Sequence, residues 1–118
     1  MPADLSKSIP ALLEDLYLDT VNPVKGYFTD TESVTTPTWA APPAGSSVSA
    51  TANQSVPGVA VGDSVVSVSF SAALPANQLY AGSHVSAVDT VTHTFTSTAA
   101  GAVTGAARTI KVVVADQT

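Results

Sequence analysis

The chain of 118 residues contains no cysteine, and only 6% of its residues are aromatic and 11% charged. Without cysteine, a disulfide-stapled scaffold and thiolate chemistry are both excluded. Because the apolar residues are mostly Ala and Val, we expect a thin core and a domain that gains stability from association as well as from its own burial. At this length there is room for one domain with an extended segment, but not for a second core.

Basic residues are also scarce, with 4 Lys and Arg against 9 Asp and Glu and a formal net charge of -5. Nucleic-acid binding requires a basic patch that neutralises phosphates, so the composition argues against such a partner. No apolar run approaches the roughly 20 residues of a membrane span, and the first residues show no secretory signal. We therefore expect no membrane partner either.

What the sequence does contain is a series of segments in which apolar and polar residues alternate. The clearest is residues 64–70, and similar runs occupy residues 48–56, 84–88, 91–98 and 108–115. A period of two places alternate side chains on one face of a strand. Short strands at this spacing predict a mainly β fold, a single antiparallel β-sandwich or barrel. The residues expected to be buried in it are Val66, Val68, Phe70, Val85, Val91, Phe95, Ile110, Val112 and Val114.

The N-terminal segment has a different period and carries most of the acidic residues. Apolar residues at helical spacing predict a short amphipathic helix, with Ser8 as its N-cap and Asn22-Pro23 as its stop. These residues are Ile9, Leu12, Leu13, Leu16 and Tyr17. Because a helix of about ten residues is marginal in isolation, its apolar face must dock, either on its own domain or on a neighbouring subunit. We therefore divide the chain into an arm, residues 1–35, and a β-domain, residues 36–118.

The segment that joins the two parts is rich in Thr and Pro. Residues 24–28 resemble a short strand weakened by Gly26, and residues 29–47 predict a linker or a strand at a sheet edge. Trp39, the single Trp of the chain, lies within this segment. It either plugs the open end of the sandwich or anchors the arm in a groove of a partner.

Residues with catalytic or metal-binding chemistry are few. A serine hydrolase needs a nucleophile, a base and an orienting acid in contact, and only His84 and His93 are available as the base. An alternative is that the two histidines meet across a hairpin at Asp89-Thr90, but a metal site would need further ligands, for which Asp63 and Asp89 are the nearest carboxylates in sequence. We expect a plain cross-strand pair, and no catalytic residue, metal or cofactor.

Three short motifs, in order, resemble a small β-domain that recurs among the virion proteins of tailed phages. They are Val56-Pro57-Gly58-Val59-Ala60-Val61-Gly62-Asp63-Ser64-Val65, then Ala73-Leu74-Pro75, then His84-Val85-Ser86-Ala87-Val88-Asp89-Thr90-Val91. In that family a Gly-Asp-x-Val strand, a Leu-Pro turn and a Val-Ser-Ala-x-Asp/Asn-Thr-Val hairpin follow one another. The resemblance covers about residues 40–115 and leaves the N-terminal arm outside.

The resemblance implies a structural protein, most often a capsid decoration (cement) protein that binds the outer capsid surface and stabilises the head by bridging neighbouring subunits. Its partners would be the major capsid protein and other copies of itself, as a homotrimer. Such a protein is made in the host cytoplasm and resides in the virion. It carries no catalytic residues. The contact residues expected in this chain are the apolar helix face of the arm and Trp39.

An alternative function is a carbohydrate- or receptor-binding β-module of a phage fibre or tail. Sugar-binding surfaces usually need exposed aromatic side chains, which are sparse here. Tyr80, in the segment that follows Pro75, is the residue that keeps this alternative open.

Overall fold

The computed structural model describes residues 24–43, 46–98 and 101–118, and these residues form strands and no helix. The strands are β1 (Gly26–Thr35), β2 (Ser49–Ser55), β3 (Ser64–Phe70), β4 (Gln78–Ala87), β5 (Thr90–Ser97) and β6 (Ala107–Asp116). The prediction of a mainly β chain is therefore confirmed. The predicted helix, with Ile9, Leu12, Leu13, Leu16 and Tyr17, lies outside the described residues.

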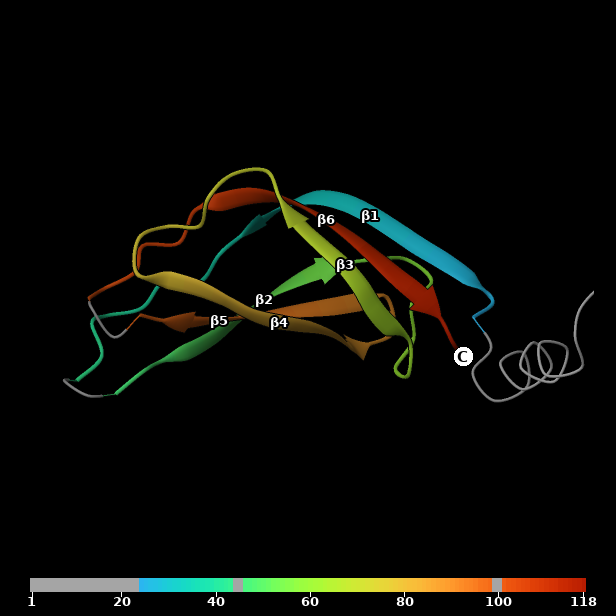
Figure 1. Cartoon of the computed structure of the whole chain (residues 1–118), viewed down its shortest axis with the longest axis horizontal. Helices are drawn as coiled ribbons and strands as arrows, with labels where there is room; N and C mark the ends of the chain where they lie inside the picture. The colour runs from blue at the N-terminus through green and yellow to red at the C-terminus, as the bar shows by residue number, and fades with distance from the viewer. Residues whose placement is uncertain (1–23, 44–45, 99–100) are drawn as a thin grey trace, which may run out of the picture.

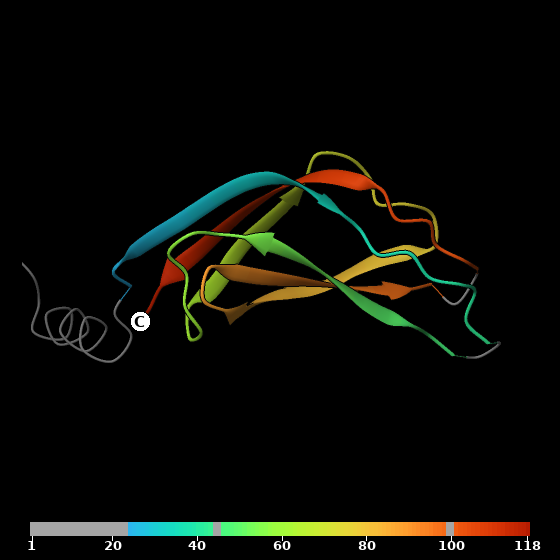
Figure 2. The same ribbon diagram turned by 180° about the vertical axis from the view of Figure 1, so that it is seen from behind.

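The strands form two antiparallel sheets of three strands each, in the orders β1-β6-β3 and β2-β5-β4. In Figures 1 and 2 the first sheet lies above the second, as two layers. Only β4 and β5 are joined as a hairpin within one sheet, because every other connection between consecutive strands passes from one sheet to the other. β5 and β6 are the central strands of the two sheets. β6 therefore pairs with both β1 and β3 and holds them together.

β1 occupies sequence that was assigned to the arm. It pairs with β6 along its whole length, from Gly26 opposite Asp116 to Thr35 opposite Ala107. It is an edge strand, which was one of the two alternatives for residues 29–47, but the predicted boundary at residue 36 is too late. The alternation was hard to recognise because Asp30 and Glu32 occupy inward positions that apolar residues usually fill.

The core between the sheets is built almost entirely from valine. Most of the predicted core residues are buried, including Val91, Phe95, Ile110, Val112 and Val114, none of which has more than a trace of exposed surface. Val68 and Phe70 are partly buried against this core. The core is thin, as the composition predicts.

The prediction for Val66 is wrong, because its side chain is 54% exposed. The pairing of β3 with β6 shifts by one residue between Val65 and Ser67, which is a β-bulge. An extra residue in one strand reverses the face of the residues on one side of it. Val65 therefore packs against the core beside Val68 and Phe70, and Val66 faces outward.

The β4–β5 hairpin fastens the loop between β2 and β3. Asp89 at its tip has a φ of 59°, and its carboxylate Oδ1 accepts a hydrogen bond from the Gly58 N–H at 2.8 Å. Its backbone N–H donates to the Val59 carbonyl, and its carbonyl accepts from the Val56 N–H. β4 itself is longer than predicted, because Gln78 to Tyr80 are strand residues and not part of a loop.

Candidate functional site

The described residues bring one group of polar side chains together, and it lies inside the fold. His93 of β5 is fully buried between the sheets. Its Nδ1 lies 2.6 Å from Ser83 Oγ of β4, and its Nε2 lies 2.9 Å from Gln54 Oε1 of β2. Tyr80 extends this group at one end through a hydrogen bond to Ser83, and Asp30 of β1 extends it at the other, 2.9 Å from Gln54 Nε2. We call these five residues the buried polar chain.

The direction of every hydrogen bond in this chain follows from Gln54. Its Nε2 faces two acceptors, the Asp30 carboxylate and the Ile110 carbonyl at 3.1 Å, so this atom is the donating nitrogen. Gln54 Oε1 must then accept, which places the proton of His93 on Nε2.

The remaining hydrogen bonds are then fixed. In a neutral imidazole the other nitrogen, Nδ1, accepts, so Ser83 donates to it and Tyr80 donates to Ser83. The polar chain is therefore fully satisfied from Tyr80 to Asp30. Because a buried polar group without a partner is costly, the chain also fixes how the two sheets are placed against one another.

Burial lowers the pKa of His93 below its ordinary value, since the protonated ring would lose its hydration inside the core. The ring is therefore neutral at neutral pH. A serine hydrolase holds its histidine between the nucleophile and an orienting carboxylate. Here the nitrogen opposite Ser83 meets an amide, and the Ser83 oxygen already accepts the Tyr80 hydroxyl. We interpret the buried polar chain as a structural link between the sheets.

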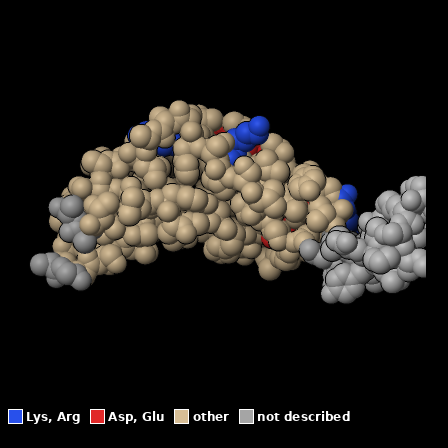
Figure 3. Space-filling view, in the orientation of Figure 1, with Lys and Arg blue, Asp and Glu red and all other residues tan. Residues whose placement is uncertain are grey.

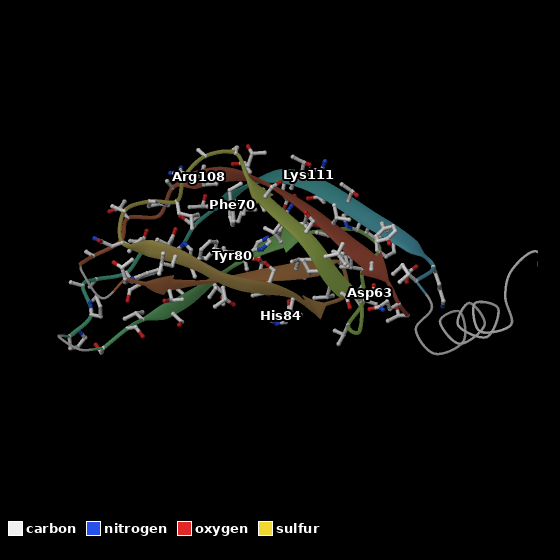
Figure 4. All side chains as sticks on the ribbon, in the orientation of Figure 1. Asp63, Phe70, Tyr80, His84, Arg108 and Lys111 are labelled. Atoms are coloured by element: carbon white, nitrogen blue, oxygen red, sulfur yellow. The ribbon has the colours of Figure 1, made fainter. Side chains whose placement is uncertain are left out.

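The two histidines do not form the expected cross-strand pair. His93 lies opposite Ser83, and His84 lies opposite Thr92. Since successive side chains of a strand point to opposite faces, His84 projects outward while His93 projects into the core. Figure 4 shows His84 directed away from the other sheet. A metal site with both histidines as ligands is thereby excluded in this arrangement, and the described residues contain no group of three or more His, Cys, Asp or Glu suited to a metal ion.

Asp63, the other candidate carboxylate, is a structural acceptor. The Ala60 N–H contributes most to lowering the pKa of Asp63 below its ordinary value, against the opposing effect of burial, and hydrogen bonds from Gln117 and Thr118 add to it. The Ala60 and Gln117 amides each lie 2.9 Å from a carboxylate oxygen, and the Thr118 hydroxyl lies at 3.0 Å. Asp63 therefore joins the start of β3 to the residues that follow β6 (Figure 4).

Trp39 is held in place by contacts within its own domain. Its backbone exchanges two hydrogen bonds with Val103, at 3.0 and 2.9 Å, and its side chain is half-buried. The indole Nε1 is buried and has no hydrogen-bond partner among the described residues. This position agrees with the plug interpretation more than with an indole displayed to a partner.

The surface with the most unusual composition is the outer face of the β2-β5-β4 sheet. None of the residues in its three strands is Asp, Glu, Lys or Arg. Its outward side chains are mainly hydroxyls, in paired rows such as Ser49 beside Thr96 and Thr51 beside Thr94. We call this surface the uncharged face. In Figure 3 the blue Lys and Arg side chains lie on the upper layer and at the right end, and the lower layer is almost entirely tan.

The sequence contained partial signals for these features. Gln54 occupies an inward position of the alternation over residues 48–56, so a polar group in the core was recognisable in principle. Ser83 and Asp30 gave no such signal, because their roles depend on the pairing of distant strands.

No described helix is both long and apolar enough to span a membrane. Comparison of the chain with protein-family models, with curated proteins and with solved structures found no match.

Proposed function

We propose that this chain is a structural virion protein of a tailed phage, a capsid decoration protein that binds the outer capsid surface and bridges neighbouring capsid subunits. The observation that carries the proposal is the uncharged face. Soluble surfaces typically carry about 25–35% charged residues of mixed sign, whereas the centres of protein interfaces are depleted in charge. A hydroxyl-rich face suits a broad contact in which water molecules bridge part of the hydrogen bonds.

The places of the motif residues in the fold support the same proposal. Asp63 of the Gly-Asp-x-Val motif holds the start of β3 to the chain after β6, and Asp89 of the hairpin motif holds the loop between β2 and β3. Leu74-Pro75 lies in the connection between β3 and β4. These residues make the turns and clamps of the β-domain, which is what a recurring structural module would need to retain.

The arm supplies the second part of the proposal. Through the short amphipathic helix predicted for it, the arm would attach the protein to the major capsid protein or to a neighbouring copy, with Ile9, Leu12, Leu13, Leu16 and Tyr17 as contact residues. An apolar helix face can be buried in a groove of the partner. Trp39 lies beyond the far end of β1 from the arm, beside Val103, so it would act within the β-domain and not in the contact made by the arm. The assembly expected on the capsid is a homotrimer.

The alternative is a carbohydrate- or receptor-binding module, for which Tyr80 is the candidate contact residue. The contacts of Tyr80 within its own domain weaken this alternative. The Tyr80 ring packs edge-to-face on Phe70 and Phe95, with centroids 5.3 and 6.0 Å apart, and its hydroxyl is bonded to Ser83. Figure 4 shows Phe70 and Tyr80 at the seam between β3 and β4. Tyr80 is still 36% exposed, but these contacts tie its ring and its hydroxyl to its own domain.

The test compares one charged substitution on the uncharged face with a matched one on the other sheet. Thr51→Glu places a carboxylate at an exposed position of β2 on the uncharged face, and Ser33→Glu places one at an exposed position of β1. Each variant is incubated with virions that have been stripped of the protein, and bound protein is measured after sedimentation. We expect occupancy to fall at least tenfold for Thr51→Glu and to stay unchanged for Ser33→Glu.

Equal binding of the two variants would contradict a role for the uncharged face. Electron microscopy of the same particles locates the protein. Regular occupancy of the capsid lattice supports decoration, and density confined to the tail or fibre tips would instead favour the alternative module.

A further inference from the structure

The outer face of the other sheet, β1-β6-β3, carries exposed apolar side chains on its two edge strands. Tyr27 of β1 is 65% exposed and Val66 of β3 is 54% exposed. Between them, on β6, lie Ala115, which is buried and pairs with Tyr27, and Val113, which is half-buried and pairs with Ser67 next to the bulge. We call these four residues the apolar strip. The strip exists because the bulge turns Val66 outward. Leaving these apolar side chains exposed to water is unfavourable.

The same sheet carries the Lys and Arg side chains of the described residues, together with the carboxylates of Asp30, Glu32 and Asp116. Arg108 and Lys111 belong to β6, and Lys25 immediately precedes β1. Lys111 is exposed on the outer face, between Thr31 and Ser69 in the pairing of the strands, neither of which is charged. Lys25 lies near the other end of the sheet, where its Nζ donates to the Thr118 carbonyl. The apolar strip therefore lies on a face that favours an acidic partner.

We propose that the occupant of the apolar strip is the chain's own N-terminal segment, residues 8–17. This segment carries its apolar residues at helical spacing together with Glu14 and Asp15, so it is complementary to the strip in both apolar character and charge. Its chain enters the described domain at Val24, three residues before Tyr27. The connection between Tyr17 and Val24 can extend over about 20 Å at the ordinary length per residue. Neighbouring strands are only about 4.8 Å apart, so the strip is within reach.

Because the segment and the strip belong to the same chain, each copy of the protein supplies its own segment. A short linker between two binding groups gives an effective concentration on the order of millimolar, so at micromolar protein the attached segment occupies the strip ahead of that of any other copy. The two apolar surfaces then cover one another in the free protein. This inference rests on the proposed decoration function only in that a capsid partner would compete with the strip for the same segment.

The absence of cysteine makes a clean test possible with engineered pairs. Leu13→Cys is combined with Val66→Cys on the apolar strip or, as a matched control, with Thr51→Cys on the uncharged face. Both partner positions are exposed strand residues. Disulfide formation under mild oxidation is followed on non-reducing gels and by mass spectrometry at micromolar concentration. We expect the pair with Val66 to close within one chain at least tenfold faster than the pair with Thr51.

Equal rates for the two pairs would overturn the proposal, because the segment would then have no preferred face. A disulfide specific for Val66 but formed between chains would overturn it too, since a second copy would be the occupant. The pair Leu16→Cys with Tyr27→Cys provides an independent repeat at the other end of the strip. The experiment uses only the free protein, so its failure would leave capsid binding untouched, and a failure of capsid binding would leave this result standing.

Discussion

At the scale of single residues, the most consequential side chain is His93, a titratable ring enclosed by both sheets. Its neighbours in the buried polar chain are neutral on both sides, Ser83 and the amide of Gln54, and the nearest carboxylate, Asp30, is reached only through that amide. A proton on the ring would therefore place an unbalanced charge in the core and reverse a hydrogen bond to Ser83.

This arrangement predicts a loss of stability in mild acid. The unfolded chain binds a proton on His93 near pH 6.5, whereas the folded pKa is lowered, so below about 6.5 the unfolded state is favoured progressively. We expect the free energy of unfolding to decrease as the pH falls from 7.5 towards 5, with a slope of at most about 1.4 kcal/mol per pH unit from this group. Urea unfolding at several pH values measures it.

The control for this prediction is His93→Gln, which keeps a polar side chain at the position but cannot titrate. It should lower stability at every pH and flatten the slope between pH 7.5 and 5. His84 is present in both proteins, so its contribution cancels in the comparison. An unchanged slope in His93→Gln would assign the acid sensitivity to another group.

At the scale of elements, the bulge in β3 decides which of two adjacent valines belongs to the core. Val65 packs against the core residues, and Val66 is exposed on the apolar strip. Val65→Ala should therefore destabilise the protein by about 1–2 kcal/mol, from the buried methyl groups removed and the space left behind. Val66→Ala should change stability by less than about 0.5 kcal/mol. Chemical denaturation of the two variants compares them directly, and a larger effect at Val66 would mean that the strand has the uninterrupted alternation.

The same strand shows how far the sequence alone can predict this fold. Alternation over residues 48–56, 91–98 and 108–115 located β2, β5 and β6 and the faces they bury, because each has an unbroken period of two. Val66 was misassigned because a bulge leaves no mark in composition. β1 was only partly recognised because Asp30 and Glu32 face inward, where they meet Gln54 and the Ser55 N–H across the gap between the sheets. The partners of Asp30 come from a strand of the other sheet, which no local pattern specifies.

For the candidate site the limit is similar. The alternation places His93 on the same strand face as the predicted core residues Val91 and Phe95, but the sequence interpretation paired it with His84 and did not assign it to the core. The sequence did not supply Ser83, because the placement of Ser83 opposite His93 depends on a shift in the pairing of β4 with β5 after Tyr80. The uncharged face, by contrast, follows from composition once the strands are assigned to sheets.

At the scale of the whole molecule, the arm and the β-domain should separate by function. Deleting residues 1–20 removes the segment proposed to attach the protein and leaves every described strand intact. We expect the truncated protein to keep the far-ultraviolet circular dichroism spectrum of a β protein and to lose binding to stripped virions. Unchanged occupancy of the particles would show that the β-domain alone makes the contact.

The state of assembly is the second prediction at this scale. The thin core and the uncharged face favour association, and we expect the full chain to have the mass of a trimer in light scattering at high concentration. A monomer at every concentration would contradict a stable free trimer. Thr51→Glu should lower the trimer fraction if copies meet through the uncharged face, and Ser33→Glu should not.

The central position of β6 also determines when this protein can fold as it is made. β1 and β3 have no backbone partner within their sheet other than β6, which follows both of them in the chain. At a synthesis rate of about 5–20 residues per second, both strands wait for seconds with unpaired edges. β2 waits in the same way for β5, its only partner within its own sheet. The nascent chain therefore closes its valine core only when β6 emerges.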